Sequence, residues 1–369
     1  MTHSKKNNET TKKYNEAILV FSLAVAAAIL IKLPALFGIS LDQNESFYFR
    51  NLSLFVLPLL TGYFVWKQRP TTRTLTWLAL IFVTAAVVAN IYPFDPDSDT
   101  EVLLSLHLPF ALWLVVGIAY TGSRWKQVGG RMDFIRFSGE LFIYYVLIAL
   151  GGGVMMALMA LIFQTIEIDI EPLFESWILP CGAVGAVIIA SWLVEIKQGL
   201  AENLAPVLAR LFSPLFTIVL ITFLGTLLYT GRALEIERDM LIAFDMLLVM
   251  VLGLLLYSIS ARNPESPPGV FDVIQIVLII SALIANGIAL WAIGGRITEL
   301  GFTPNRVVAL GMNVILLANL VWSAVLYIRF IRGRTSFSLL EKWQTDYLPV
   351  YAIWAAIVVI VIPQLFEYA

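Results

Sequence analysis

Residues 240–260 read MLIAFDMLLVMVLGLLLYSIS, a run of 21 residues with a single charge, Asp245. An α-helix rises about 1.5 Å per residue, so a run of this length spans the hydrocarbon core of a membrane, which is about 30 Å thick. Lipid cannot satisfy backbone N–H and C=O groups, whereas a helix bonds them internally. The stretch therefore predicts a transmembrane helix that carries one polar group inside the membrane.

Ten further apolar stretches follow the same pattern, and most charged residues lie between them. Together they predict an all-α fold, a polytopic transmembrane helical bundle of about eleven spans. The second and last stretches are the shortest. The predicted spans cover residues 17–37, 51–66, 74–92, 102–120, 141–163, 177–196, 214–231, 240–260, 273–293, 307–328 and 351–366.

The composition is typical of a membrane protein rather than a soluble enzyme. Hydrophobic residues make up 59% of the chain and charged residues 14%, and the mean hydropathy is +0.85. The net charge of −2 gives no reason to expect nucleic acid as a partner. Cys181 is the one cysteine, and His3 and His107 are the only histidines, so the sequence predicts no disulfide framework, no metal site and no cofactor.

Lysine and arginine are distributed unevenly over the two sets of loops. With the N-terminus inside, the inner segments carry 18 of the 24 basic residues and the outer segments carry five. Positive charge collects on the cytoplasmic side of membrane proteins, so this bias predicts an N-in, C-out topology. The five outer basic residues are Arg50, Arg232, Arg238, Arg296 and Arg306.

The chain is predicted to consist of a tail and one membrane domain. Residues 1–16, MTHSKKNNETTKKYNE, are polar and basic and are typical of a cytoplasmic tail rather than a signal peptide. Residues 17–369 contain only short loops, so we expect a single multi-span domain there. Two inner connections, 197–213 and 337–347, place apolar residues at near-helical spacing, which predicts amphipathic helices that lie on the membrane as structural connectors.

Three motifs resemble a bacterial polytopic family that is catalogued as domain of unknown function 4153. They are FIRFSGELFIYY at 134–145, which leads into Gly151–Gly153; LARLFSPL at 208–215; and RITELGFTPNR at 296–306. In order and spacing they cover roughly positions 100–330, and the third is the most specific. The resemblance implies a multi-pass protein of the bacterial cytoplasmic (inner) membrane, and it transfers no activity.

Two charged residues lie inside predicted spans, where charge is costly and marks function by default. Lys32 lies five residues before the outer end of the first span, and Asp245 lies five residues after the outer start of the eighth. Both therefore begin roughly 7–8 Å below the outer interface. Lysine can snorkel to the headgroups, but aspartate is too short. We expect Asp245 to face the protein interior with a polar partner, and Lys32 is the first candidate.

The start of the tenth span is a candidate anion site. Thr303 fits the N-cap of a helix and Pro304 its first position. Arg306 would then lie in the first turn, where a cation opposes the helix dipole. A bound phosphate or carboxylate would explain that charge, and an ion pair with Glu299 is the alternative.

The hypothetical ligand site at this outer face takes in residues from two neighbouring spans. Two arginines and one glutamate leave a surplus of positive charge, which favours an anionic small molecule or lipid headgroup. Two asparagines in the adjoining spans lie at a depth similar to that of Lys32 and Asp245. The proposed set is Arg296, Glu299, Arg306, Asn286 and Asn313.

Gly151, Gly152 and Gly153 occupy the centre of the fifth span. Glycine permits both close helix approach and helix distortion. The triplet therefore predicts a close helix crossing, or a broken helix that lines a cavity in the middle of the membrane.

The sequence contains no recognisable catalytic constellation. No serine or cysteine nucleophile pairs with His107, and the loop carboxylates define no acid–base pair. The leading hypothesis is a transport or lipid-handling protein with membrane lipids as partners and an anionic ligand at its outer face. The alternatives are a non-enzymatic scaffold, sensor or assembly partner and, third, an intramembrane transferase or hydrolase.

Overall fold

The computed structural model of this chain describes residues 2–95, 98–164, 167–196, 198–230 and 238–369. It describes side chains at 14–95, 98–164, 167–196, 207–230 and 241–369. In these ranges the chain folds into helices and contains no strand. Eleven helices of the described chain are long and apolar enough to cross a membrane. The predicted all-α polytopic fold is therefore confirmed.

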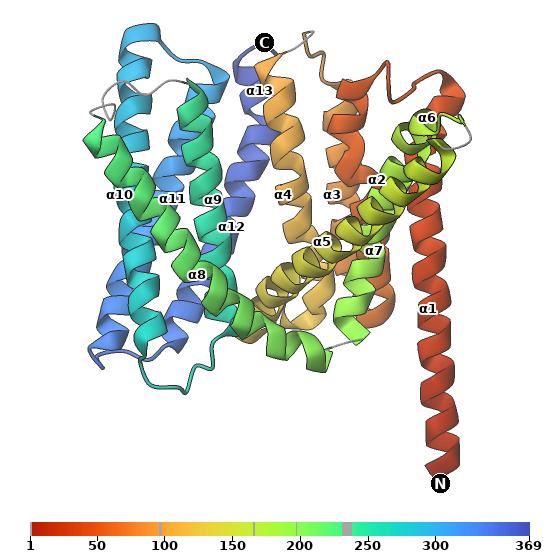
Figure 1. The fold of residues 1–369 in the computed structure, drawn as a ribbon, viewed down its shortest axis with the longest axis horizontal. Coiled ribbons are helices and arrows are strands. Elements are labelled where there is room, and N and C mark those ends of the chain that lie inside the picture. The colour runs from red at the N-terminus through yellow and green to blue at the C-terminus, as the bar shows by residue number, and fades with distance from the viewer. Residues whose placement is uncertain (1, 96–97, 165–166, 197, 231–237) are drawn as a thin grey trace. The chain divides into compact units, whose positions relative to one another are not determined.

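The helices group into two compact units, each assembled from separate parts of the chain (Figure 1). The first unit consists of Met1–Ile91, Leu112–Ser123 and Glu140–Gln198, and the second of Tyr92–Ala111, Arg124–Gly139 and Gly199–Ala369. Helices α4 (Asp99–Thr121) and α5 (Val128–Gln164) contribute to both. The single domain expected at 17–369 stays a prediction.

The first unit is built around α1 (Thr2–Lys32), which packs against α2 (Glu45–Gln68) and α7 (Leu179–Ile196). At one end of these three helices, Lys67 lies between two carboxylates. Its Nζ is 3.3 Å from Glu16 Oε1 and 2.5 Å from Glu195 Oε2. Tyr63 donates a further hydrogen bond of 2.6 Å to Glu16. The remaining elements are η1 (Leu33–Phe37), α3 (Thr72–Ile91), η2 (Gly122–Lys126), α6 (Glu171–Leu173) and the π-helical turn η3 (Phe174–Ile178).

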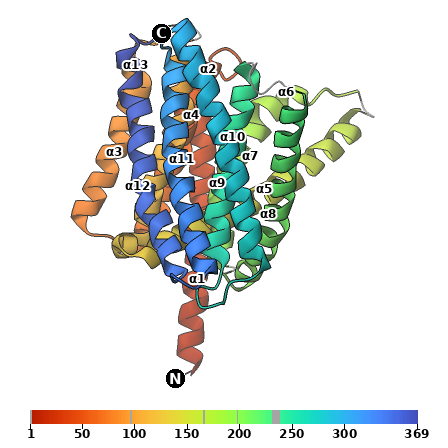
Figure 2. The ribbon, with the colours of Figure 1, turned by 90° about the vertical axis from the view of Figure 1, so that its left-hand side faces the viewer.

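The second unit is a bundle in which α9, α10, α11 and α12 run alongside one another (Figures 1 and 2). Helix α10 packs against α9 and α11, and α11 also packs against α12. Gly311 permits the close approach of α11 and α12, because a Cβ there would lie 2.0 Å from Trp354 Cη2. The bounds are α8 (Gln198–Tyr229), α9 (Arg238–Ala261), α10 (Val270–Leu300), α11 (Pro304–Ile331), α12 (Ser338–Ile360) and α13 (Ile362–Leu365).

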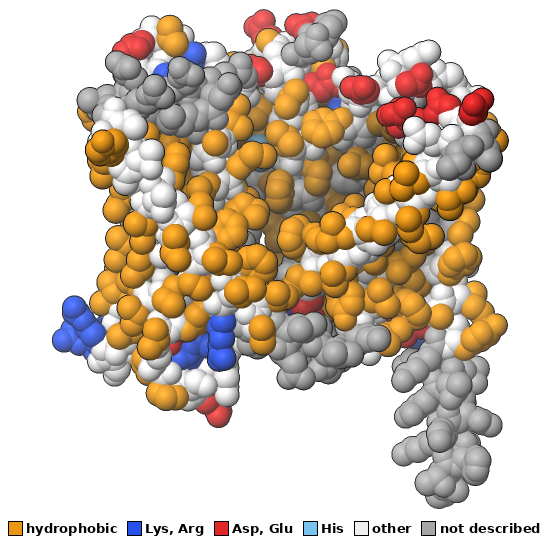
Figure 3. All heavy atoms as spheres, in the orientation of Figure 1, with side chains coloured by type: hydrophobic (Ala, Val, Ile, Leu, Met, Phe, Trp, Pro, Cys, Tyr) orange, Lys and Arg blue, Asp and Glu red, His pale blue; other side chains and the backbone are white. Residues whose placement is uncertain are grey.

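Charge separates along the second unit. Figure 3 shows hydrophobic side chains over the length of its helices, with Lys and Arg gathered at the end where α11 leads into α12. Arg262 at the end of α9 and Arg329 in the last turn of α11 belong to that end. The pattern agrees with an apolar belt that has a basic inner edge.

Two predicted surface helices are parts of longer helices. Residues 337–347 open α12, whose first residues pack inward: Phe337 is 1% and Leu340 0% exposed. Residues 338–347 are helical and pack against the bundle, as expected of a structural connector. They belong to the last span-length helix, which is Ser338–Ile360 instead of the predicted 351–366. In the other connection, 197–213, the backbone of α8 is continuous from Gln198 to Tyr229. Residue 197 and the side chains of 198–206 lie outside the described residues, as do those of 1–13 in the predicted tail.

Among the residues that the structure describes, the glycine triplet lies at no close helix crossing. Helix α5 runs unbroken through Gly151, Gly152 and Gly153, all three are exposed, and a Cβ added at any of them would meet nothing within 4 Å. The predicted close crossing within this chain, and the predicted broken helix, are therefore wrong. The reason is that α5 is apolar all round, so its glycines do not indicate which side packs.

Candidate functional site

Three polar residues that the sequence singled out meet inside the second unit. Asn313 of α11 donates through Nδ2 to Asp245 Oδ1 of α9, at 2.7 Å. Asn286 of α10 donates through Nδ2 to Asn313 Oδ1 at 3.0 Å and to the Asn313 carbonyl at 3.1 Å. Three helices of the bundle each supply one residue of this chain. We call Asp245, Asn313 and Asn286 the carboxyl–amide chain.

All three residues of the carboxyl–amide chain lie within span-length helices. Asp245 is the fifth residue of the span that begins at Leu241, and Asn286 and Asn313 lie within the spans Val270–Leu300 and Pro304–Ile331. Both asparagines are 0% exposed, and Asp245 is half-buried. Apolar residues flank each of the three, so their polar atoms must find partners within the bundle, and Asn313 Nδ2 also donates to the Ala309 carbonyl at 2.9 Å.

The carboxyl–amide chain has no cationic partner among the residues whose side chains the structure describes. Lys32 was the first candidate partner of Asp245, but the two residues have different partners. Asp245 accepts a hydrogen bond from Asn313, and the Lys32 ammonium lies over the Trp177 ring, 4.6 Å from its centroid. Trp177 belongs to η3, a π-helical turn of the kind often found at functional positions. The expectation of a polar partner for Asp245 is met, but the partner is a neutral amide.

One polar atom of the chain is left over. Asn286 Oδ1 is buried and has no hydrogen-bond partner in the described residues. An unsatisfied buried carbonyl costs on the order of 1–3 kcal/mol. Such an atom in an otherwise paired cluster indicates a position that a donor or a cation can fill.

The predicted anion site at the outer face has a different geometry. Thr303 is the N-cap of α11, as predicted, and its Oγ1 accepts from the Arg306 N–H at 3.4 Å. Arg306 Nη1 donates to the carbonyls of Leu300 and Gly301, at 3.1 and 2.8 Å. Its charge is therefore tolerated because it caps the negative C-terminal end of α10.

The other members of that predicted set are not gathered around Arg306 in the described structure. Glu299 makes no hydrogen bond or ion pair with any residue whose side chain is described, so the Glu299–Arg306 pair expected as the alternative is wrong. Asn286 and Asn313 belong to the carboxyl–amide chain instead. Binding of an anion by Arg296 and Arg306 stays a prediction.

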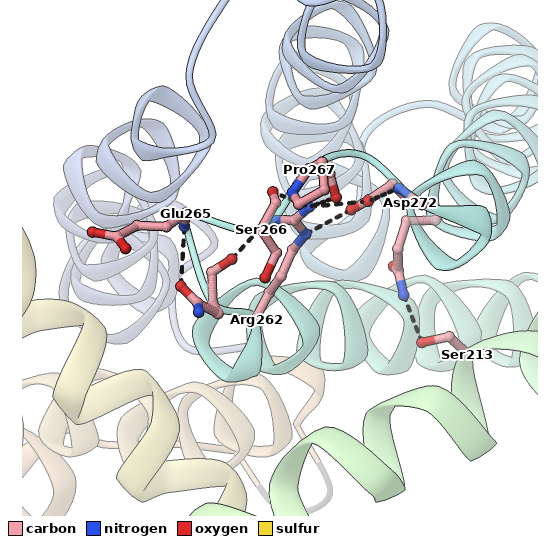
Figure 4. A network of polar contacts seen from close by, with 9 residues as sticks. Ser213, Arg262, Glu265, Ser266, Pro267 and Asp272 are labelled. Carbon is pink, nitrogen blue, oxygen red and sulfur yellow. Dashed lines mark hydrogen bonds and ion pairs between the residues drawn. The ribbon is translucent and has the colours of Figure 1, made fainter.

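A second polar cluster surrounds Arg262, which is one of the basic residues of the predicted inner segments (Figure 4). The guanidinium forms an ion pair with Asp272 and donates to the carbonyls of Asn263, Ser266 and Pro267. Its carbon lies 4.7 Å from the Phe330 ring centroid and 4.4 Å from that of Phe337. Every face of the group is occupied, so Arg262 ties the α9–α10 loop to the α11–α12 corner.

Beside this cluster the first turns of α10 carry further buried polar groups. Asp272 Oδ2 accepts from the Gly269 N–H at 2.8 Å and so caps the helix. Gln275 donates to Ser213 of α8 at 2.7 Å, and Ser213 in turn bonds to Ser258 of α9. A pocket of about 330 Å³ opens here, and Arg210, Arg262 and Asp272 lie in its wall. The Gln275–Ser213–Ser258 contacts join α8, α9 and α10 beside this pocket, and Gln275 Oε1 is buried with no partner among the described residues.

A third cluster joins α11 to α12. Gln344 Nε2 donates to Ser323 at 2.7 Å, and Asn319 Nδ2 donates to Gln344 Oε1 at 3.1 Å. All three residues are 0% exposed and are satisfied by one another. Gln275, Asn319 and Gln344 were missed as buried polar positions, although Gln275 and Asn319 each stand inside an apolar run, which was the available signal.

The fold and these clusters define a polytopic, all-α, membrane-spanning protein with polar contacts buried between its helices. Comparison with known proteins found no matching family model, no matching curated protein and no matching solved structure.

Proposed function

We propose that this protein is a bacterial inner-membrane protein with a transport or lipid-handling role, centred on the carboxyl–amide chain. The observation that carries the proposal is the Asp245–Asn313–Asn286 contact inside three spans. Ionisable residues within spans are expensive, face the protein interior and mark the paths of substrates or ions. Asp245 has these properties and lacks a purely structural counter-charge among the described side chains.

The proposed orientation is N-in, C-out. It is supported by the excess of basic residues in the inner segments and by the eleven span-length helices, since an odd number of crossings separates the two ends of the chain. The bacterial inner membrane is inferred from the resemblance of the three motifs to the bacterial family, and membership of that family is part of the proposal.

An anionic lipid headgroup or small molecule remains the proposed ligand class at the outer face. Arg306 is engaged with carbonyl groups, so such an anion would be bound by sharing its guanidinium rather than by a free arginine. This places less weight on the outer arginines and more on the carboxyl–amide chain.

Native purification with mass spectrometry tests the proposal. Wild-type protein and the Asp245→Asn variant are isolated in lipid nanodiscs, and their bound lipids and metabolites are compared. We expect at least one compound class to be depleted about tenfold in the variant, which corresponds to about 1.4 kcal/mol of binding energy. Glu367→Gln is the matched control, because it removes an exposed carboxylate that belongs to none of the proposed sites. Equal profiles in all three proteins would contradict the proposal.

A non-enzymatic scaffold is the second candidate, and one observation favours it. The part of α5 that crosses the membrane presents large apolar side chains over its length, including Phe142, Leu150 and Leu158, and none of its 18-residue span window is buried. Such a helix suits either lipid or a partner helix. Cross-linking from α5 to another membrane protein, together with unchanged ligand profiles in Asp245→Asn, would favour the scaffold.

A further inference from the structure

The two ends of the carboxyl–amide chain both present oxygen atoms. At one end, Asp245 accepts one hydrogen bond, on Oδ1, from a described side chain. At the other, the buried Asn286 Oδ1 accepts none. Two acceptors and no spare donor can take a positive ligand or a hydrogen-bond donor, and they repel an anion. The site itself therefore selects a proton, a metal cation or water.

Among the described side chains, the charged groups on the surrounding helices lie away from Asp245. On α10 they are Asp272, Arg296 and Glu299, which lie 14, 10 and 13 residues from Asn286, or roughly 15–21 Å along the helix. On α11, Arg306 bonds to the end of α10, and Arg329 lies in the last turn. On α8 the neighbour is apolar, because Phe223 stacks edge-on against Phe244 at 5.0 Å. The charged residues of α12, which also contacts α9, are Glu341, Lys342 and Asp346 near its first turns.

A carboxylate in these surroundings has two states that differ in cost. The ionised carboxylate carries a full negative charge at membrane depth. The single hydrogen bond from Asn313 does not offset the cost of placing that charge there. The protonated carboxyl group is neutral. The amides moderate the difference. Asn313 Nδ2 donates to the carboxyl group, and Asn286 Nδ2 donates to Asn313 Oδ1, which polarises the Asn313 amide and so stabilises negative charge on Asp245.

We propose that Asp245 is a reversible proton-binding site within the membrane, with Asn313 and Asn286 as positioning residues that stabilise its ionised form. The inference deepens the proposed function, on which it rests, by naming the proton as the ion that the site takes. A proton from water bonds to one carboxyl oxygen and changes the charge of Asp245 from −1 to 0. It returns to water when the site opens, so no other reactant is required.

A metal cation fits the same place less well. Hard cations surround themselves with several oxygen atoms. Asn313 Oδ1 already accepts from Asn286, so the described side chains leave the Asp245 carboxylate and Asn286 Oδ1 as donors. A proton needs only one oxygen.

Infrared spectroscopy tests the proposal on the full-length protein in nanodiscs. A carbonyl-stretch band of a protonated carboxyl group is expected at neutral pH and should disappear as the pH is raised. The band should be absent in Asp245→Asn, which keeps an acceptor oxygen for Asn313, and present in Glu367→Gln. In Asn313→Leu, which removes the amide donor, it should persist to higher pH.

The measurement stays decisive if Asp245→Asn fails to fold. Labelling with ¹³C-aspartate then assigns the band to an aspartate, and its persistence to higher pH in Asn313→Leu assigns it to Asp245, the carboxyl group that Asn313 contacts. A band that is missing at every pH, or that survives in Asp245→Asn, overturns the proposal. A band lost on adding NaCl at constant pH overturns it in favour of a metal cation. A titrating band together with equal ligand profiles leaves the proton site standing while the proposed function fails.

Discussion

At the residue scale, buried polar groups in this protein divide by whether their contacts are complete. Arg262 and the Asn319–Ser323–Gln344 cluster have their polar atoms matched and therefore hold helices together. The carboxyl–amide chain is incomplete, since one amide oxygen has no partner and one carboxyl has no counter-charge among the described side chains. An unmatched atom alone does not mark a ligand site, since Gln275 Oε1 is also buried without a described partner. The carboxyl–amide chain differs in that it also holds an ionisable group inside a span.

Breaking the Arg262–Asp272 pair should be strongly destabilising. The two side chains are 10% and 4% exposed, so removing either leaves a buried charge unpaired. We expect Arg262→Met or Asp272→Leu to lower the free energy of unfolding by about 3–5 kcal/mol. The double variant should recover part of the loss, because no orphaned charge remains. Thermal melting in nanodiscs measures all three, and an additive double variant would contradict the interpretation.

Arg306→Gln should weaken the α10–α11 connection. The guanidinium donates to two carbonyls at the end of α10, and glutamine cannot supply the charge that those carbonyls favour. The expected loss is about 1 kcal/mol of unfolding free energy, measured by thermal melting, with Glu299→Gln unchanged as the control. A variant of full stability that loses binding of phosphate-headgroup lipids would instead restore Arg306 to a ligand role.

At the element scale, helix contacts are decided by a few small residues whose position the chain alone does not reveal. Gly311 lies where α11 and α12 cross, and Gly152 lies on an open face of α5. Both are glycines within apolar helices, yet one touches a tryptophan and the other touches nothing within 4 Å.

The two glycines form a matched pair for mutation. Gly311→Ala should lower the unfolding free energy by about 1–3 kcal/mol, because its Cβ would collide with Trp354 and force the helices apart. Gly152→Ala should leave it unchanged or raise it by up to about 1 kcal/mol, since alanine is the better helix former. Thermal melting of both variants gives the answer. A Gly152→Ala variant as unstable as Gly311→Ala would show that another chain packs on α5.

At the scale of the whole molecule, the eleven span-length helices make a topological prediction. Reporter fusions should place the N-terminus in the cytoplasm and the C-terminus outside, because basic residues favour the cytoplasmic side. Cysteine labelling at engineered positions in the loops checks each crossing, with Cys181 replaced by alanine to remove the background. Both termini on one side would require an even number of crossings and would defeat the proposed orientation.

The sequence by itself determined the spans, because crossing a membrane depends on the hydropathy and length of one continuous segment. It also located the α11 N-cap, since Thr303–Pro304 is a local signal. It did not determine where long helices end outside the membrane, so residues 337–347 were separated from α12, which begins at Ser338.

Only the tertiary structure decided which polar residues meet. Asp245, Asn286 and Asn313 were each visible in the sequence, but their contact depends on how α9, α10 and α11 rotate about their axes. In a soluble helix the apolar stripe fixes that rotation. Here apolar side chains face both lipid and neighbouring helices, so hydropathy distinguishes neither side. The partner of Arg306 and the open face of Gly151–Gly153 were hidden for the same reason.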